Sequence, residues 1–173
     1  NTTVNIGAPV APFGVLFANS AAVPYSMFGA AIGGGGPLVV NGGGVVTLNN
    51  ATNTYTGGTV ISNGSTLSVP AEVLGDPAGA VTIDGGKLQF TGTATIPATR
   101  AVTLGSSNAT IDITFIASGS LDDQTTTGVK YAAAITGPGG LTVTGGPGVN
   151  DPANAPYLLI LDGQANSYAG NTL

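Results

Sequence analysis

The chain has 173 residues, a formal net charge of −5 and only 6% charged residues. Its three cations, Lys87, Arg100 and Lys130, are too few to neutralise a row of phosphates, which argues against nucleic acid as a partner. The mean hydropathy is +0.36, yet no run of about 18 apolar residues could span a bilayer, so no membrane span is expected.

Short apolar pieces of Val, Leu and Ile alternate with Gly, Asn and Thr, and this texture predicts an all-β fold of many short strands. The chain has no cysteine, so disulfides contribute nothing to its stability. No basic and apolar leader opens it, and Asn1 is therefore expected to be a processed or fragment end, which would fit export from the cell.

The first segment, residues 1–36, is rich in Pro and Gly and predicts an irregular entry. Residues 37–115 are regular: the segments 39–48, 60–69, 81–90 and 102–113 each consist of a strand, a Gly/Asn turn and a second strand. Their first valines recur at one constant interval: Val39, Val60, Val81 and Val102. A fixed period of about 21 residues predicts a parallel β-helix, or solenoid, whose coils stack with these valines in one column.

Alternation within the second strands predicts which side chains form the core. The inward set is Leu67, Val69, Leu88, Phe90, Ile111, Ile113 and Phe115. Between the strand pairs lie three connectors of equal length, and their apolar members are expected to form a third, looser side of each coil: Tyr55, Val73, Leu74 and Ile96. Low charge also fits a stack, because a charge that recurs in every coil would repel its copies.

Asn-Gly and Asp-Gly between alternating strands are equally typical of two-residue hairpins. The alternative fold is therefore an antiparallel β-sandwich built from hairpins. The constant step favours the solenoid, because independent hairpins have no reason to keep a common period.

The stretch GGGVVTLNNATNTYTGGTVISNGSTLSV, residues 42–69, resembles the autotransporter-associated β-strand repeat, also called the passenger-associated transport repeat. The resemblance continues more weakly through 74–90, 135–145 and 158–173. That family occurs in large secreted bacterial surface proteins, and the resemblance implies a right-handed parallel β-helix of the kind found in passenger domains. No membrane barrel sequence follows here.

The rest of the chain is interpreted as a loop insertion at 116–130 and a second repeat block at 131–173, so that 1–173 is one solenoid domain. NTYTGGT (53–59) returns as NSYAGNT (166–172), and both copies are expected at the same corner of the coil. The second copy departs from the family pattern, with NDPANAPY (150–157) inserted before its Leu-rich strand and Asn171 in place of a Gly.

Catalytic chemistry is not expected, because glycosidases on such scaffolds need paired carboxyl groups and no such pair is visible among the eight acids. No cofactor is expected either. Asp122 and Asp123 form the one acidic cluster and are the candidate Ca²⁺ ligands, although adjacent Asp residues fit a solvated loop tip better. Tyr55 and Tyr168 are interpreted as packing residues rather than a sugar platform. Possible glycosylation sequons start at Asn1, Asn50, Asn63 and Asn108.

The leading functional hypothesis is a structural, extracellular protein of the bacterial cell surface. Copies would stack head to tail into a fibre or adhesin stalk, with Val4 and Ile6 of one copy meeting Tyr168 and Leu173 of another. One alternative is a monomeric passenger or adhesin fragment that binds surface glycans or proteins, and a less favoured one is a carbohydrate-active enzyme.

Overall fold

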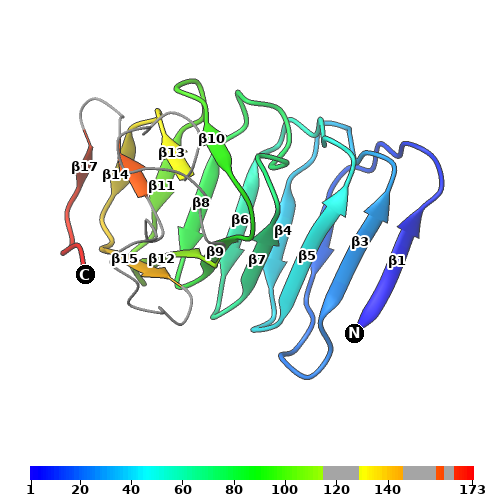
Figure 1. Cartoon of the computed structure of the whole chain (residues 1–173), viewed down its shortest axis with the longest axis horizontal. Coiled ribbons are helices and arrows are strands. Elements are labelled where there is room, and N and C mark those ends of the chain that lie inside the picture. Colours follow the sequence, from blue (N-terminus) through cyan, green and yellow to red (C-terminus); the bar gives the residue numbers. More distant parts are fainter. Residues whose placement is uncertain (115–128, 146–158, 162–165) are drawn as a thin grey trace, which may run out of the picture.

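A computed structural model describes residues 1–114, 129–145, 159–161 and 166–173, and within them the chain forms strands but no helix. The strands lie side by side along the longest axis of the molecule, with the N- and C-termini at its opposite ends (Figure 1). They are β1 (Thr2–Ile6), β2 (Val15–Phe17), β3 (Tyr25–Gly29), β4 (Leu38–Asn41), β5 (Val45–Asn50), β6 (Thr59–Ser62), β7 (Thr66–Val69), β8 (Val81–Asp84), β9 (Lys87–Phe90), β10 (Ala94–Ile96), β11 (Val102–Leu104), β12 (Ala109–Ile113), β13 (Val129–Tyr131), β14 (Ile135–Gly137), β15 (Leu141–Gly145), β16 (Leu159–Leu161) and β17 (Ser167–Tyr168).

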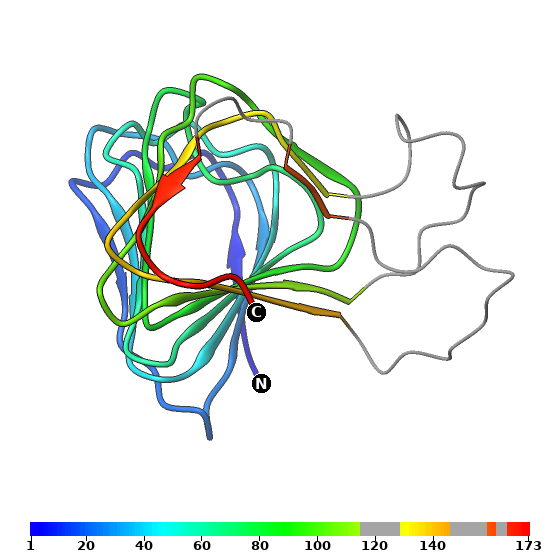
Figure 2. The same ribbon diagram turned by 90° about the vertical axis from the view of Figure 1, so that its left-hand side faces the viewer.

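Three parallel sheets form the sides of the coil. The first sheet has the order β1-β3-β5-β7-β9-β12-β15, the second sheet has the order β17-β14-β11-β8-β6-β4-β2, and the short sheet is β10-β13-β16. Seen along the axis, the ribbon closes around one central region, which inward-facing apolar side chains fill (Figure 2). The predicted parallel β-helix is therefore confirmed, and the antiparallel sandwich is excluded.

The inward column of the first sheet follows the predicted alternation. Leu67 pairs with Leu88, and Leu88 pairs with Ile111, so the column stays in register although its second step is longer than its first. All three side chains are 0–1% exposed. The predicted inward residues of these strands are thus confirmed, except Phe115, which lies outside the described residues.

The predicted valine column is wrong by one residue. Val60 pairs with Val39 and Thr82 and faces outward, whereas Val81 pairs with Thr59 and faces the core. The cause is the connector before β8: the second sheet advances from Thr59 to Val81, one residue more than the first sheet advances from Thr66 to Lys87. The turn between β8 and β9 then compensates, with two residues where the turn between β6 and β7 has three. Because side chains alternate along a strand, a shift of one residue exchanges the two faces.

The third side of the coil is tighter than expected. Tyr55, Leu74 and Ile96 are at most 1% exposed, and Val73 is 7% exposed. Ile96 belongs to β10, which opens the short sheet. The apolar residues of the connectors therefore complete the core, as the sequence predicted.

Residues 1–36 are more regular than their Pro and Gly content suggested. They contribute β1, β2 and β3, and β3 pairs in register with β5. The Pro and Gly residues lie mainly in the connectors between these strands, where they do not interrupt a ladder. Of the expected insertion 116–130, residues 116–128 lie outside the described part of the chain, and its last two residues belong to β13.

The register can be tested with two matched substitutions. Val102 is 1% exposed between Val81 and Ile135, so Val102→Thr buries a hydroxyl among apolar neighbours and should lower the free energy of unfolding by about 1–3 kcal/mol. Val60→Thr, on the outer face beside Thr82, should change it by less than about 0.5 kcal/mol. Urea unfolding followed by circular dichroism measures both, and equal losses would contradict the assigned faces.

Candidate functional site

The N-terminal end of the stack is formed by β1 and β2, each of which hydrogen-bonds to a neighbouring strand on one side only in the part of the chain that the structure describes. Val4 pairs with Met27, and Ile6 pairs with Gly29. Both side chains are half-buried and pack against the core. The outward edge of this coil is therefore an open row of backbone donors and acceptors above apolar side chains.

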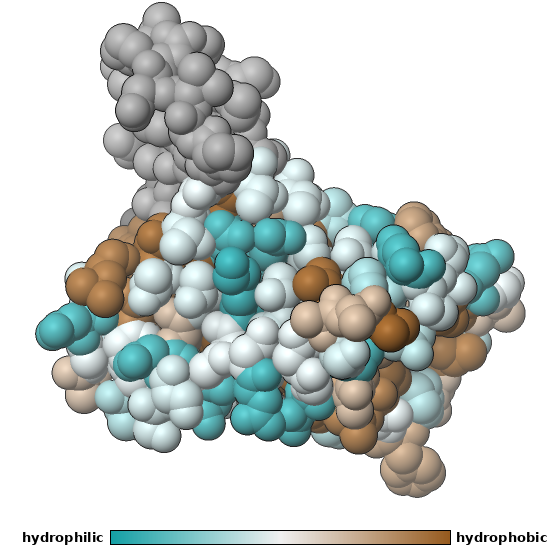
Figure 3. Space-filling model, turned by 90° about the horizontal axis from the view of Figure 1, so that it is seen from below, coloured by the Kyte–Doolittle hydropathy of each residue, from teal (hydrophilic) through white to brown (hydrophobic). Residues whose placement is uncertain are grey.

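A hollow opens into the core at this end. Its volume is about 440 Å³, and its lining includes the turn Ile6–Pro9 together with the core side chains of Met27 and Ile32. Large exposed apolar side chains are concentrated in the same coils: Val10, Phe13, Leu16, Val23, Phe28 and Val45. On the face shown in Figure 3, brown surface gathers over the right-hand, N-terminal half and at the left-hand end.

The C-terminal end is formed by β15 and β17 and the residues that follow. Leu173 N–H donates to Leu141 O at 2.9 Å and Leu173 O accepts from Val143 N–H at 2.9 Å, so it begins a new rung over β15. Its side chain is 80% exposed. Tyr168 is half-buried against the core.

The structure thus places Val4 and Ile6 at one end of the molecule and Tyr168 and Leu173 at the other (Figure 1). One copy does not bring the two pairs together. A head-to-tail contact between copies requires this separation, because the two surfaces that make the contact must belong to different copies.

The repeated phrase NTYTGGT forms a defined corner. The Asn53 Oδ1 accepts from Ile32 N–H at 2.9 Å in the coil below, and the Tyr55 hydroxyl shares a hydrogen bond of 2.7 Å with Thr59 Oγ1. The second copy repeats both contacts: Asn166 Oδ1 accepts from Ile135 N–H at 2.8 Å, and the Tyr168 hydroxyl bonds to Thr172 Oγ1. Both tyrosines are packing residues in this structure.

The two copies nevertheless lie at different corners of the coil, contrary to the expectation from the sequence. Tyr55 precedes β6 and leads into the second sheet, whereas Tyr168 lies in β17 of the second sheet and leads to Thr172, which bridges to Leu141 in the first. Both copies share the tyrosine–threonine hydrogen bond and the asparagine contact to the rung below, while Asn53 also donates to Val73 O in the rung above. The phrase can therefore form the same local structure at either corner.

Arg100 joins the two coils that stack on the corner formed by residues 53–59. Its guanidinium is fully buried and donates to Leu74 O (3.0 Å), Gly79 O (2.7 Å) and Gly75 O (3.0 Å). Nη2 also lies 2.8 Å from Glu72 Oε1, a close ionic contact that is not aligned as a hydrogen bond. Sequence reasoning missed this role, although Arg100 is the only charged residue of the connector 91–101.

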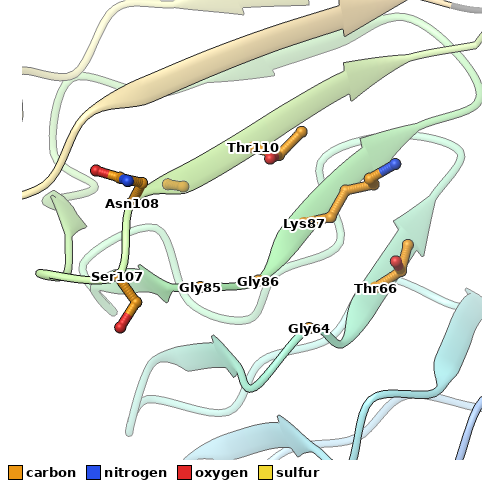
Figure 4. A pocket seen from close by; sticks show the side chains of 9 residues that line it. Gly64, Thr66, Gly85, Gly86, Lys87, Ser107, Asn108 and Thr110 are labelled. Carbon is orange, nitrogen blue, oxygen red and sulfur yellow. The ribbon is translucent and has the colours of Figure 1, made fainter. Parts of the chain in front are cut away.

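A polar hollow of about 220 Å³ crosses three coils on the outer face of the first sheet (Figure 4). Gly64, Gly85 and Gly86 line it together with Thr66, Lys87, Asn108 and Thr110. The Lys87 ammonium lies 3.6 Å from Asp112 Oδ2. The hollow offers hydroxyl, amide and ammonium groups but no aromatic ring, so it can hydrogen-bond a hydroxyl-rich ligand without stacking on it.

Asp112 is held in its charged form beside this hollow. Burial opposes ionisation, but Gln89 Nε2 (2.9 Å) and Thr144 Oγ1 (2.7 Å) donate to the carboxylate, and Lys87 is close. These contacts keep the pKa of Asp112 below its ordinary value. The aspartate therefore ties three adjacent coils together.

The other acids of the described segments also have structural partners. Asp76 Oδ1 accepts from Ala78 N–H within its own turn, and Asp84 Oδ1 accepts from Ser107 N–H in the next coil. In the described ranges no group of three or more His, Cys, Asp or Glu side chains could hold a metal ion. The candidate calcium ligands Asp122 and Asp123 lie outside them.

Of the four sequons, the one at Asn50 is buried. Its Nδ2 donates to Ala30 O and Asn53 Oδ1, and the residue is 7% exposed, so a glycan has no room there in the folded chain. Asn63 and Asn108 occupy turn positions with φ of 53° and 63°. Glycosylation at Asn1, Asn63 and Asn108 stays a prediction.

No helix long and apolar enough to cross a membrane occurs in the described residues. Comparisons of the chain with protein-family models, with curated proteins and with solved structures found no match. What the protein does must therefore be inferred from its geometry.

Arg100 should matter more for stability than its ion-pair partner. Arg100→Met leaves three buried carbonyls and a partly buried carboxylate without their donor, and we expect it to lower the free energy of unfolding by about 3–5 kcal/mol. Glu72→Gln keeps an acceptor and lies nearer the surface, so it should cost clearly less. Urea unfolding of the two variants gives the comparison, and a larger loss for Glu72→Gln would contradict this role.

Tyr55 should make the fold sensitive to alkali. Burial raises its pKa to about 12, despite the hydrogen bond to Thr59, while an unfolded tyrosine titrates near 10. The unfolded chain therefore loses this proton first, and stability falls as the pH rises from about 10 to 12, by about 2–3 kcal/mol for this group. Burial also raises the pKa of Tyr131, so Tyr55→Phe should make the decline shallower without abolishing it. Urea midpoints of the wild type and of Tyr55→Phe at pH 8, 10 and 11 check this. An equal decline of the midpoint with pH in the two proteins would refute the role of Tyr55.

Proposed function

We propose that the protein is a structural scaffold, a segment of an extracellular bacterial stalk or fibre whose copies stack head to tail. The observation that carries this proposal is the distribution of large exposed apolar side chains. Within the described residues they lie at positions 10–45 and at 161 and 173, and none lies on the coils between. A rod whose exposed apolar side chains are concentrated in its terminal coils is suited to association near its ends.

The backbone supports the same contact. The open edge of β1 at one end and the single rung over β15 at the other offer parallel ladders that a second copy can continue. The two surfaces differ, so the contact is heterologous, and a heterologous contact that does not close into a ring generates a filament.

The extracellular and bacterial assignment is supported by the resemblance of residues 42–69 to the autotransporter-associated repeat. The scarcity of charge also fits a scaffold, because the outward positions of the first sheet are mostly Thr, Ser and Gln, which stack in successive coils without the repulsion of like charges. The described acids make hydrogen bonds and ion pairs within turns and between coils, which favours a structural role over catalysis.

A second candidate function is a passenger or adhesin segment that remains monomeric and binds surface glycans or proteins. The hollow around Lys87, Thr66 and Thr110 favours this candidate, because its hydroxyl and amide groups match those of a saccharide. It takes second place because the hollow contains no aromatic platform.

Assembly is tested directly on the purified chain. We expect rods of increasing length in electron micrographs, and a sedimentation coefficient that rises with protein concentration. Val4→Lys combined with Ile6→Lys should leave monomers, because two charges would be buried at the N-terminal end. Thr82→Lys, on the outer face of a central coil, is the matched control and should still form rods.

Circular dichroism establishes that both variants are folded. Wild-type chains that stay monomeric at millimolar concentration would refute the stacking proposal and leave the monomeric adhesin as the better candidate.

A further inference from the structure

This inference rests on the proposed head-to-tail stacking and concerns its register. The first tyrosine corner shows how a third rung covers such a corner. Gly75 lies on the Tyr55 ring, so closely that a Cβ there would be 2.6 Å from the ring carbon Cε2. Asp76 N–H donates to Tyr55 O at 2.9 Å, which places Asp76 over Thr56. Under this rung Tyr55 is only 1% exposed.

The second corner has the two lower rungs of the same arrangement. Ala169 N–H donates to Gly137 O at 2.9 Å, as Thr56 N–H donates to Gly34 O at 3.0 Å in the first corner. Within the described residues no rung covers it: Tyr168 is half-buried and Ala169 is exposed. The Tyr168 ring and Tyr168 O are thus open to a further rung, which would place a glycine over the ring and the N–H of the next residue on the carbonyl.

The N-terminal coil carries a segment of the required type. Ile6-Gly7-Ala8-Pro9 repeats the order of Leu74-Gly75-Asp76-Pro77, a branched aliphatic residue, Gly, a small residue and Pro. No atom lies within 4 Å of the position of a Cβ at Gly7, and Ala8 is exposed. This turn lines the hollow of about 440 Å³, which leaves space beside it for an aromatic ring.

We propose that Gly7–Ala8 of one copy lies over Tyr168–Ala169 of its neighbour, with the Tyr168 ring under Gly7 and Ala8 N–H donating to Tyr168 O. Gly75 has a φ of 82°, a conformation that Gly7 does not have in the free end but can adopt as a glycine at little cost. In this register the end of β1 stacks on β17. The first sheet of one copy then continues the second sheet of the other, and successive copies are turned by one side of the coil.

Disulfide trapping tests the register cleanly, because the chain has no cysteine. Stacked rungs lie about 4.8 Å apart, which is within the Cα separation that a disulfide bridges. Ala8→Cys with Ala169→Cys should give covalent ladders on a non-reducing gel after oxidation. Ala8→Cys with Thr103→Cys, which lies on the side of a central coil, is the control and should not.

A second pair, Asn1→Cys with Leu173→Cys, reports the alternative in which the first sheet of one copy continues the first sheet of the next, because Leu173 and Asn1 belong to the same column of that sheet. Rods without Ala8–Ala169 ladders, whether or not Asn1–Leu173 ladders form, would overturn the proposed register and leave the stacking proposal intact. Chains that form neither rods nor ladders would refute both.

A glycine substitution gives an independent readout. Gly7→Val places a side chain on the Tyr168 ring and should raise the concentration needed for assembly by about tenfold or more, equivalent to about 1.4 kcal/mol. Gly35→Val, at another exposed glycine with open space around it, is the control and should assemble like the wild type. Equal assembly of the two variants would count against the contact.

Discussion

The fold depends on the register between successive coils. Each rung is hydrogen-bonded to the rung below, and the side-chain alternation within a strand then decides which residues face the core. The two long sheets need not keep the same step: the advance of the second sheet from Thr59 to Val81 is one residue longer than that of the first from Thr66 to Lys87. A short turn compensates for a long connector, so the columns of both sheets stay intact.

The corners depend on a second constraint, the pairing of polar groups that the stack buries. Asn53 is 2% exposed and uses its amide to bridge the coil below, through Ile32 N–H, and the coil above, through Val73 O. Arg100, one coil further up, has the same function and binds three carbonyls of the rung below it. A coil with few charges therefore places its single buried cation where backbone carbonyls turn inward, because an unpaired carbonyl there would be costly.

The sequence predicted the parts of this structure that depend on local pattern. The inward positions of Leu67, Leu88 and Ile111 follow from alternation within one strand, and the solenoid follows from the period. The break of the valine column between Val60 and Val81 could not be predicted, because it results from two compensating changes in length. The same limit applies to the site: a terminal position marks Tyr168 and Leu173, whereas the match between Gly7 and Gly75 is visible only once a glycine is seen lying on a tyrosine ring.

The coils also differ in how much chain they hold. The step from Ile111 to Val143 is far longer than the step from Leu67 to Leu88, and the pairing between β12 and β15 nevertheless stays in register along the whole of both strands. Length added to one coil thus leaves the axial rise of the stack unchanged. Natural variation can therefore lengthen a coil without altering the length of the rod. In a protein of this architecture, the number of residues in a coil and the length of the rod can evolve separately.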